Sequence, residues 1–169
     1  MPQSRNPAAN ARRVMLLLAA AAAAAALVFF LAPFAAPYGT YWGLDGSPGM
    51  MDRSWEPAEF PYIIGDILCH QESARCFVFN GSQMPICIRD TGLLIGFVLG
   101  CLAYIPMDGK FGKRQIALSL AMVCFTAVEW AAEPYSGDFP RTRFLTGIVS
   151  GAGAGMLLGW LVRRGTSGE

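Results

Sequence analysis

Three cysteines, the single histidine and an aspartate fall within residues 69–90, and their side chains are of the types that bind metal ions. These residues are Cys69, His70, Cys76, Cys87 and Asp90. Thiolate, imidazole and carboxylate groups are the ligands of tetrahedral zinc and related sites. Residues 69–70 and residues 87–90 are two short segments that can offer two ligands each. The sequence therefore predicts a divalent transition metal, with zinc favoured, bound by Cys69, His70, Cys87 and Asp90.

The same cysteines have two other uses that the spacing leaves open. Neighbouring side chains diverge, so use of Cys69 or His70 alone is favoured over use of both. Outside the cytoplasm, two of Cys69, Cys76 and Cys87 can instead form a structural disulfide. A third interpretation is a thiol–disulfide redox protein that uses Cys76 and Cys87. The pattern does not decide whether the protein is an enzyme.

The elements that must position these residues are set by a very apolar composition. Of the 169 residues, 54% are hydrophobic and 15% are charged, and the mean hydropathy is +0.39. A soluble globular domain is more polar than this, so we expect a membrane protein in contact with lipid. The net charge of +1 gives no basic surface of the kind that binds nucleic acid, and no nucleic-acid partner is expected.

Four apolar stretches are candidates to cross the membrane, because about 20 predominantly apolar residues are needed for one helical span. They cover residues 14–36, 91–106, 116–132 and 144–162. The second is short and needs help from flanking residues. The first is longer than the apolar core of a cleavable signal, so we expect an uncleaved anchor. The fold class predicted is an all-α integral membrane protein, a single membrane domain over residues 1–169 with four transmembrane helices.

The connection between the first two spans, residues 37–90, is long and contains the candidate metal ligands. Within it, residues 61–71 have an apolar periodicity that predicts a short helix. Basic residues cluster at the N-terminus, between the second and third spans, and at the C-terminus. Because basic segments stay on the cytoplasmic side, both termini are expected in the cytoplasm, and residues 37–90 on the outer face.

Small and charged residues in the spans suggest further contacts. Glycines recur every four residues in the second and fourth spans, a pattern that lets helices approach closely. Packing within the chain explains it, with a homo-oligomer or a partner in a larger membrane complex as the alternative. Arg89, Glu129 and Arg143 could gather beneath the loop to orient ligands or bind an anionic headgroup. The simpler alternative is that Glu129 reaches the interface or pairs with Arg141 or Arg143.

One string of residues in the loop also resembles a known family. It reads Cys69-His70-Gln71, then Arg75, then Pro85-x-Cys87-x-Arg89-x-x-Gly92-x-x-x-Gly96. This string is similar to the pattern C-H-Q-x-x-x-x-R-S and P-x-C-x-R-C-x-G of the small prokaryotic membrane proteins catalogued as domain of unknown function 2085. The match is strong over about residues 61–100. The resemblance implies a multi-pass protein of a prokaryotic cell (plasma) membrane, and it implies no particular activity.

Two positions depart from the family pattern. Cys76 stands where the family has serine, and Asp90 stands where the family has its second neighbouring cysteine. If the pattern is a metal site, a carboxylate replaces a thiolate, which zinc or iron tolerates. If the pattern is a redox pair, Cys76 has taken over from the lost neighbour of Cys87.

Overall fold

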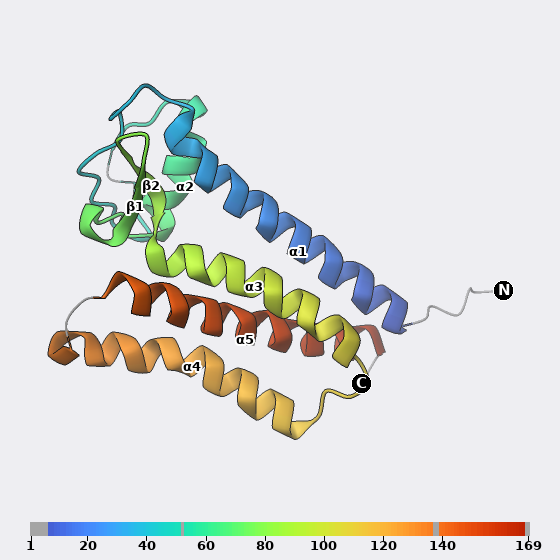
Figure 1. The fold of residues 1–169 in the computed structure, drawn as a ribbon. Coiled ribbons are helices and arrows are strands. Elements are labelled where there is room, and N and C mark those ends of the chain that lie inside the picture. Colours follow the sequence, from blue (N-terminus) through green and yellow to red (C-terminus); the bar gives the residue numbers. More distant parts are fainter. Residues whose placement is uncertain (1–6, 52, 137–138, 168–169) are drawn as a thin grey trace. The chain divides into compact units, whose positions relative to one another are not determined.

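Four long helices make up most of the computed structural model, which describes residues 7–51, 53–136 and 139–167 (Figure 1). They are α1 Pro7–Leu31, α3 Ile88–Met107, α4 Lys113–Ser136 and α5 Pro140–Ser167. By length and apolar composition, four segments can cross a membrane, namely residues 7–34, 88–107, 113–133 and 140–167. The prediction of a mostly helical protein with four candidate spans is confirmed.

α3, α4 and α5 extend beyond the apolar stretches that predicted them at both ends. α1 starts seven residues before the predicted stretch 14–36 but ends at Leu31, where a 3-10 helix that contains Pro33 follows. α3 begins at Ile88 and has 20 residues, which corresponds to about 30 Å at a rise of about 1.5 Å per residue. This length matches the hydrocarbon core of a bilayer. The second span is therefore long enough, because flanking polar residues such as Arg89 and Asp90 complete its first turn.

The chain divides into two compact units. The helical unit comprises residues 1–23 and 92–169, and the loop unit comprises residues 24–91. The helical unit contains most of the length of the four long helices, and the loop unit contains the predicted outer loop. Whether they act as one membrane domain stays a prediction.

Within the helical unit, α3 and α5 pack through their glycines. A Cβ atom on Gly96 would lie 2.1 Å from the carbonyl oxygen of Ile148, and one on Gly151 would lie 2.1 Å from that of Leu93. No side chain fits at such distances. The glycine ladders predicted as packing faces therefore contact each other within one chain, and a partner of the membrane complex would have to use other surfaces.

Helix α5 also contacts α4 through hydroxyl groups. Ser150 donates a hydrogen bond of 2.8 Å to the carbonyl oxygen of Met122, and Thr126 donates one of 3.2 Å to that of Thr146. Because a bilayer core offers no water as a partner, hydrogen bonds to the neighbouring helix satisfy these hydroxyl groups. Together with the glycine contacts, they make α5 the helix that joins α3 and α4.

Helix α1 packs its first half against α3, and its start lies beside the end of α5. Met15 and Ala19 form a buried apolar cluster with Cys101 and Tyr104. The Thr166 hydroxyl donates a 3.4 Å hydrogen bond to the carbonyl oxygen of Pro7. The start of α1 and the end of α5 thus lie at the same end of the helical unit. On which side of a membrane they lie stays a prediction.

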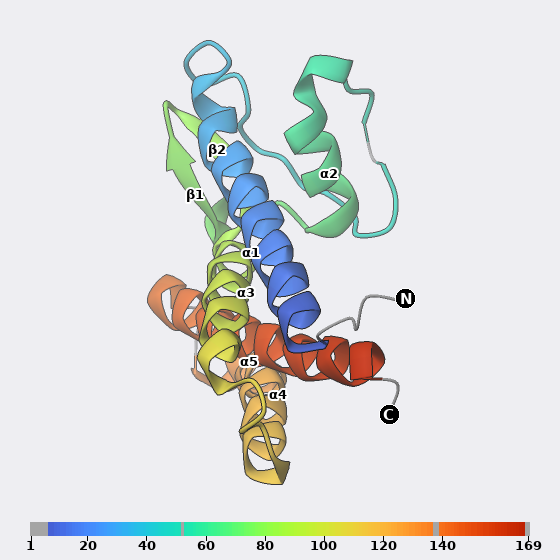
Figure 2. The ribbon, with the colours of Figure 1, turned by 90° about the vertical axis from the view of Figure 1, so that its right-hand side faces the viewer.

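The loop unit combines short helices with a β-hairpin (Figure 2). Its helices are α2 Phe60–Leu68 and three 3-10 helices, Ala32–Phe34, Pro57–Glu59 and Ser73–Arg75. The strands β1 Cys76–Phe79 and β2 Ser82–Cys87 pair in antiparallel fashion. α2 corresponds to the short helix predicted over residues 61–71, although it ends at Leu68.

The hairpin was not predicted. Its turn consists of Asn80 and Gly81, with φ of 50° and 68°, and Phe79 pairs with Ser82. Two consecutive residues with positive φ form the type I′ turn that Asn-Gly favours. This dipeptide was the sequence signal for the hairpin.

An aromatic cluster and two buried hydrogen bonds hold α2 against the hairpin. The rings of Tyr41 and Tyr62 stack with centroids 3.8 Å apart, and Trp55 packs beside them. The Tyr62 hydroxyl donates a 2.9 Å hydrogen bond to the carbonyl oxygen of Gln83 in β2. The Gln83 amide in turn donates to the carbonyl oxygen of Gln71 at 2.5 Å. These contacts fix the end of α2 relative to β2.

Candidate metal centre

Cys69 takes its position from the end of α2. It is the first residue after the helix, its backbone is extended at φ −135° and ψ 149°, and its N–H donates a 2.8 Å hydrogen bond to the carbonyl oxygen of Gly65. A Cβ atom on Gly65 would lie 2.0 Å from the carbonyl oxygen of Pro85. Only glycine therefore lets α2 approach β2 this closely, and the Cys69 thiol is buried beside the strand.

Gln71 holds the segment that follows Cys69 in place through buried hydrogen bonds. Its backbone has φ of 47°, and its side chain is 1% exposed. The amide nitrogen donates hydrogen bonds of 2.9 Å to the carbonyl oxygen of Pro85 and of 3.2 Å to that of Tyr62. Sequence analysis gave Gln71 no role. Its place in the C-H-Q string was the only signal.

Cys87 and Asp90 take their positions from the junction of β2 and α3. Cys87 is the last residue of β2, and Asp90 lies in the first turn of α3. The Asp90 N–H donates to Cys87 Sγ at 3.5 Å, and Cys87 Sγ lies 3.2 Å from Asp90 Oδ2. The positive end of the helix dipole favours a thiolate and a carboxylate at this place.

The three side chains converge. The Cys87 N–H donates a 3.2 Å hydrogen bond to Cys69 Sγ, and one ligand atom from each of Cys69, Cys87 and Asp90 lies within 4.8 Å of the others. In a tetrahedral zinc site, with bonds of about 2.0–2.3 Å, ligand atoms are about 3.5–3.8 Å apart. A contraction of about 1 Å would thus bring this Cys-Cys-Asp cluster to zinc-binding geometry.

The two thiols of the cluster, Cys69 and Cys87, differ in pKa. A hydrogen bond from the Cys69 thiol lowers the pKa of Cys87, against the opposing effects of burial and of the Asp90 carboxylate. The same hydrogen bond, together with burial, raises the pKa of Cys69. Cys87 is therefore the better nucleophile and metal ligand. A metal ion would have to displace the proton on Cys69.

The other predicted residues of the loop lie elsewhere. His70 is exposed, and it does not belong to the metal-ligand group found among the described residues. Cys76 is the direct partner of Cys87 in the strand register. It is buried, and desolvation by burial raises its pKa to about 12. All five cysteines lie in described parts of the chain, and all are free thiols.

The three charged residues expected beneath the loop are divided between the two units. Arg89 is half-buried in the first turn of α3. Glu129 and Arg143 belong to the helical unit, where Arg143 is 2% exposed and forms an ion pair with Glu133. Burial of both ionised partners requires this pairing. A supporting role of Arg89, Glu129 and Arg143 for the loop site stays a prediction.

Comparison with known proteins places this architecture in a family. A family model of predicted membrane proteins, domain of unknown function 2085 (DUF2085), matches residues 69–157. This match covers more than half of the chain. The chain belongs to the DUF2085 family. The matched region starts at Cys69, includes Cys87 and Asp90, and continues through α3 and α4 into α5.

Two archaeal proteins are similar to this DUF2085 protein. An uncharacterized protein of Methanocaldococcus jannaschii is 28% identical over 131 residues, which cover 73% of this chain and 79% of the relative. An uncharacterized protein of Methanothermobacter thermautotrophicus is 28% identical over 92 residues, which cover 53% of this chain and 83% of the relative. No solved structure matches the chain.

Proposed function

We propose that this membrane protein binds a divalent transition metal, preferentially zinc, through Cys69, Cys87 and Asp90. The observation that carries the proposal is the convergence of these three ligand atoms within 4.8 Å of one another. Two separate segments of the loop unit supply them, the end of α2 and the junction of β2 with α3. Zinc accepts two thiolates and one carboxylate as ligands.

The ligand set favours an open site over a closed structural one. Structural zinc sites have four protein ligands, whereas catalytic sites have three and leave one position to water or substrate. Cys87 and Asp90 are half-buried, so solvent can reach the cluster from their side. Zinc bound here would supply a Lewis acid and an acidified water molecule.

His70 is left outside the proposed ligand set. The chain offers Cys69 and His70 side by side, and the buried Cys69 thiol is the one that joins the cluster. The exposed imidazole therefore serves as a matched control, because it is adjacent in sequence and also a metal-ligand type.

The test is elemental analysis of the protein purified in mild detergent, reduced and exposed to zinc. We expect roughly one zinc ion per chain, because the described residues contain one three-ligand cluster. Cys87→Ser and Asp90→Asn should lower zinc retention strongly, while His70→Ala should keep it. Absence of zinc uptake by the reduced wild-type protein, or full retention in Cys87→Ser, would contradict the proposal.

A thiol–disulfide redox role is the second candidate, and the strand register favours it. Cys76 lies directly opposite Cys87, whose pKa is lowered by the Cys69 hydrogen bond. The Cys87 thiolate would attack a substrate disulfide, and the Cys76 thiol would then displace the reduced substrate. One disulfide forms in the protein as one is reduced in the substrate.

Counting thiols separates the two candidates. The redox candidate predicts that the protein isolated without reductant lacks two alkylatable thiols, which appear after reduction. The metal candidate predicts that chelation alone, without reductant, exposes all loop thiols to alkylation. Mass spectrometry of alkylated peptides containing Cys76 and Cys87 reads out both results.

We further infer that the protein resides in the cell membrane of a prokaryote, with the loop unit on the outer face. The basic residues at the shared end of α1 and α5, and between α3 and α4, support this orientation. A homo-oligomer or a partner in a membrane complex stays a prediction.

A further inference from the structure

A second polar site lies in the helical unit, where the connection from α3 to α4 meets the last turns of α5. A cavity of about 500 Å³ opens there. It is lined by three cations, Lys113, Arg163 and Arg164, and by three aromatic rings, Tyr104, Phe111 and Trp160. This basic pocket lies outside the loop unit and shares no residue with the Cys-Cys-Asp cluster.

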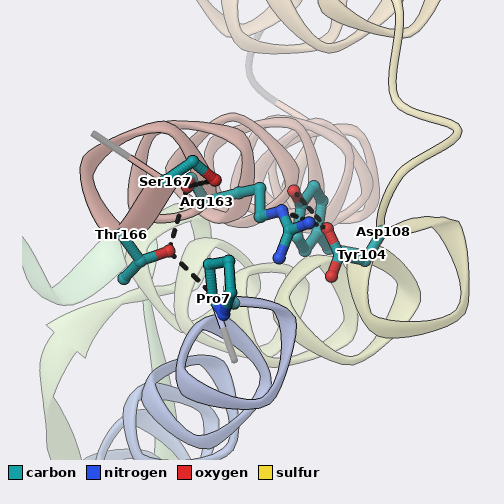
Figure 3. A network of polar contacts seen from close by, with 6 residues as sticks. All are labelled: Pro7, Tyr104, Asp108, Arg163, Thr166 and Ser167. Carbon is teal, nitrogen blue, oxygen red and sulfur yellow. Dashed lines mark hydrogen bonds and ion pairs between the residues drawn. The ribbon is translucent and has the colours of Figure 1, made fainter. Parts of the chain in front are cut away.

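Arg163, which lines this pocket, has a buried donor without an acceptor in the described part of the chain. Its Nε lies 3.5 Å from Asp108 Oδ1, and the same oxygen accepts a 3.4 Å hydrogen bond from the Tyr104 hydroxyl (Figure 3). The Nη1 atom of Arg163 is buried, and it has no hydrogen-bond partner among the described residues. A buried donor without an acceptor is costly, so an acceptor from a ligand would stabilise the pocket.

The other two cations add to the positive charge of the pocket lining. The Arg164 guanidinium lies 4.9 Å from the centroid of the Trp160 ring, a cation–π contact that restricts its orientation. Lys113 is the first residue of α4, where the helix dipole adds to its positive charge. Against these three cations stands one carboxylate, that of Asp108, so the pocket has a net positive charge.

We infer that the basic pocket binds a phosphate group. A guanidinium recognises phosphate with two parallel hydrogen bonds, and a lysine adds a point charge. The phosphate can come from an anionic lipid headgroup or from a soluble phosphate. The setting favours lipid, because Tyr104 and Trp160 lie near the ends of candidate spans, as interfacial aromatic residues do. Basic pockets between transmembrane helices are typical sites for anionic headgroups.

The test compares two double variants with equal loss of charge. Lys113→Gln with Arg164→Gln removes two cations of the pocket, and Lys110→Gln with Arg114→Gln removes two exposed cations nearby that do not line it. Arg163 stays intact to preserve its contact with Asp108. Delipidated protein in neutral detergent is titrated with phosphatidylglycerol, with phosphatidylcholine and with inorganic phosphate. Native mass spectrometry counts bound molecules, and thermal unfolding confirms that each variant is folded.

We expect phosphatidylglycerol to bind more tightly than phosphatidylcholine. The pocket variant should weaken its binding about 25-fold, at about fivefold for each cation removed, and the control variant should stay close to wild type. Binding of inorganic phosphate with the same dependence on the pocket would support the proposal with a soluble source. Equal weakening of phosphatidylglycerol binding in the two double variants would overturn the proposal. Binding of phosphatidylglycerol and of inorganic phosphate that is no tighter than binding of phosphatidylcholine would also overturn it.

Discussion

At the scale of the residue, three consecutive side chains at the end of α2 have three different surroundings. Cys69 is buried against β2, His70 is exposed, and Gln71 is buried again with two backbone acceptors. The backbone at Cys69 is extended, and successive side chains of an extended segment point to opposite sides. Adjacent Cys and His therefore do not form a pair of ligands here.

Replacing Gln71 with alanine should destabilise the loop unit by about 1–3 kcal/mol, because the carbonyl oxygens of Tyr62 and Pro85 lose their buried donor. Hydrogen exchange of the peptides covering residues 60–90 measures this opening. Gln115→Ala is the control, since its side-chain oxygen accepts a single exposed hydrogen bond from the N–H of Gly112. Equal hydrogen exchange of these peptides in the two variants would show that Gln71 does not stabilise the loop unit.

At the scale of the element, the candidate site depends on the β1–β2 hairpin. The hairpin returns the chain so that Cys87, at the end of β2, reaches Cys69, which lies 18 residues earlier and at the end of α2. Apolar length predicted the four long helices, and apolar periodicity predicted α2. The hairpin was not predicted, because its strands are short, with 4 and 6 residues, and because β2 contains Pro85.

The same comparison explains how much of the site the sequence could predict. Residue types alone singled out Cys69, His70, Cys87 and Asp90 as ligands, and Cys76 as the redox alternative; the structure brings all but His70 of the four ligands together. Their convergence depends on the Asn80-Gly81 turn and on the close approach that Gly65 permits. The close approach at Gly65 joins segments distant in sequence, so no local pattern contained it. The hairpin did have a local signal, the Asn80-Gly81 dipeptide, which was not recognised. The basic pocket was missed because its cations come from two separate helices, Lys113 from α4 and Arg163 and Arg164 from α5.

The packing of α3 on α5 gives a prediction at this scale. Gly96→Ala would place a Cβ atom 2.1 Å from a backbone oxygen, and the helices would have to separate. We expect a loss of about 1–3 kcal/mol in stability, measured by thermal unfolding in detergent. Gly165→Ala, also within a long helix but with nothing within 4 Å, should be neutral or slightly stabilising. A similar effect of both substitutions would contradict close helix packing.

At the scale of the whole molecule, one end of the helical unit collects positive charge. The Pro7–Thr166 contact and the Asp108–Arg163 ion pair bring the start of α1, the end of α3 and the end of α5 together. Basic residues lie near the start of α1, in and after the connection from α3 to α4, and near the end of α5. By the positive-inside tendency of membrane proteins, this end should face the cytoplasm.

Epitope tags test this orientation. Tags at the N-terminus and the C-terminus should be protected from external protease in intact spheroplasts, because the proposed topology places both on the cytoplasmic side. A tag inserted after Gly49 should be cleaved, since this position is exposed in the loop unit and a Cβ there would contact nothing within 4 Å. Cleavage of a terminal tag, or protection of the loop tag, would contradict the proposed topology.

The most direct measurement of the central claim is X-ray absorption at the zinc edge on the zinc-loaded protein. The Cys-Cys-Asp cluster predicts two sulfur ligands at about 2.3 Å, with the remaining ligands being oxygen or nitrogen at about 2.0–2.2 Å. The sulfur contribution should fall to one ligand or vanish with the metal in Cys87→Ser. A first shell without sulfur, or one with three sulfurs that includes Cys76, would contradict the proposed site.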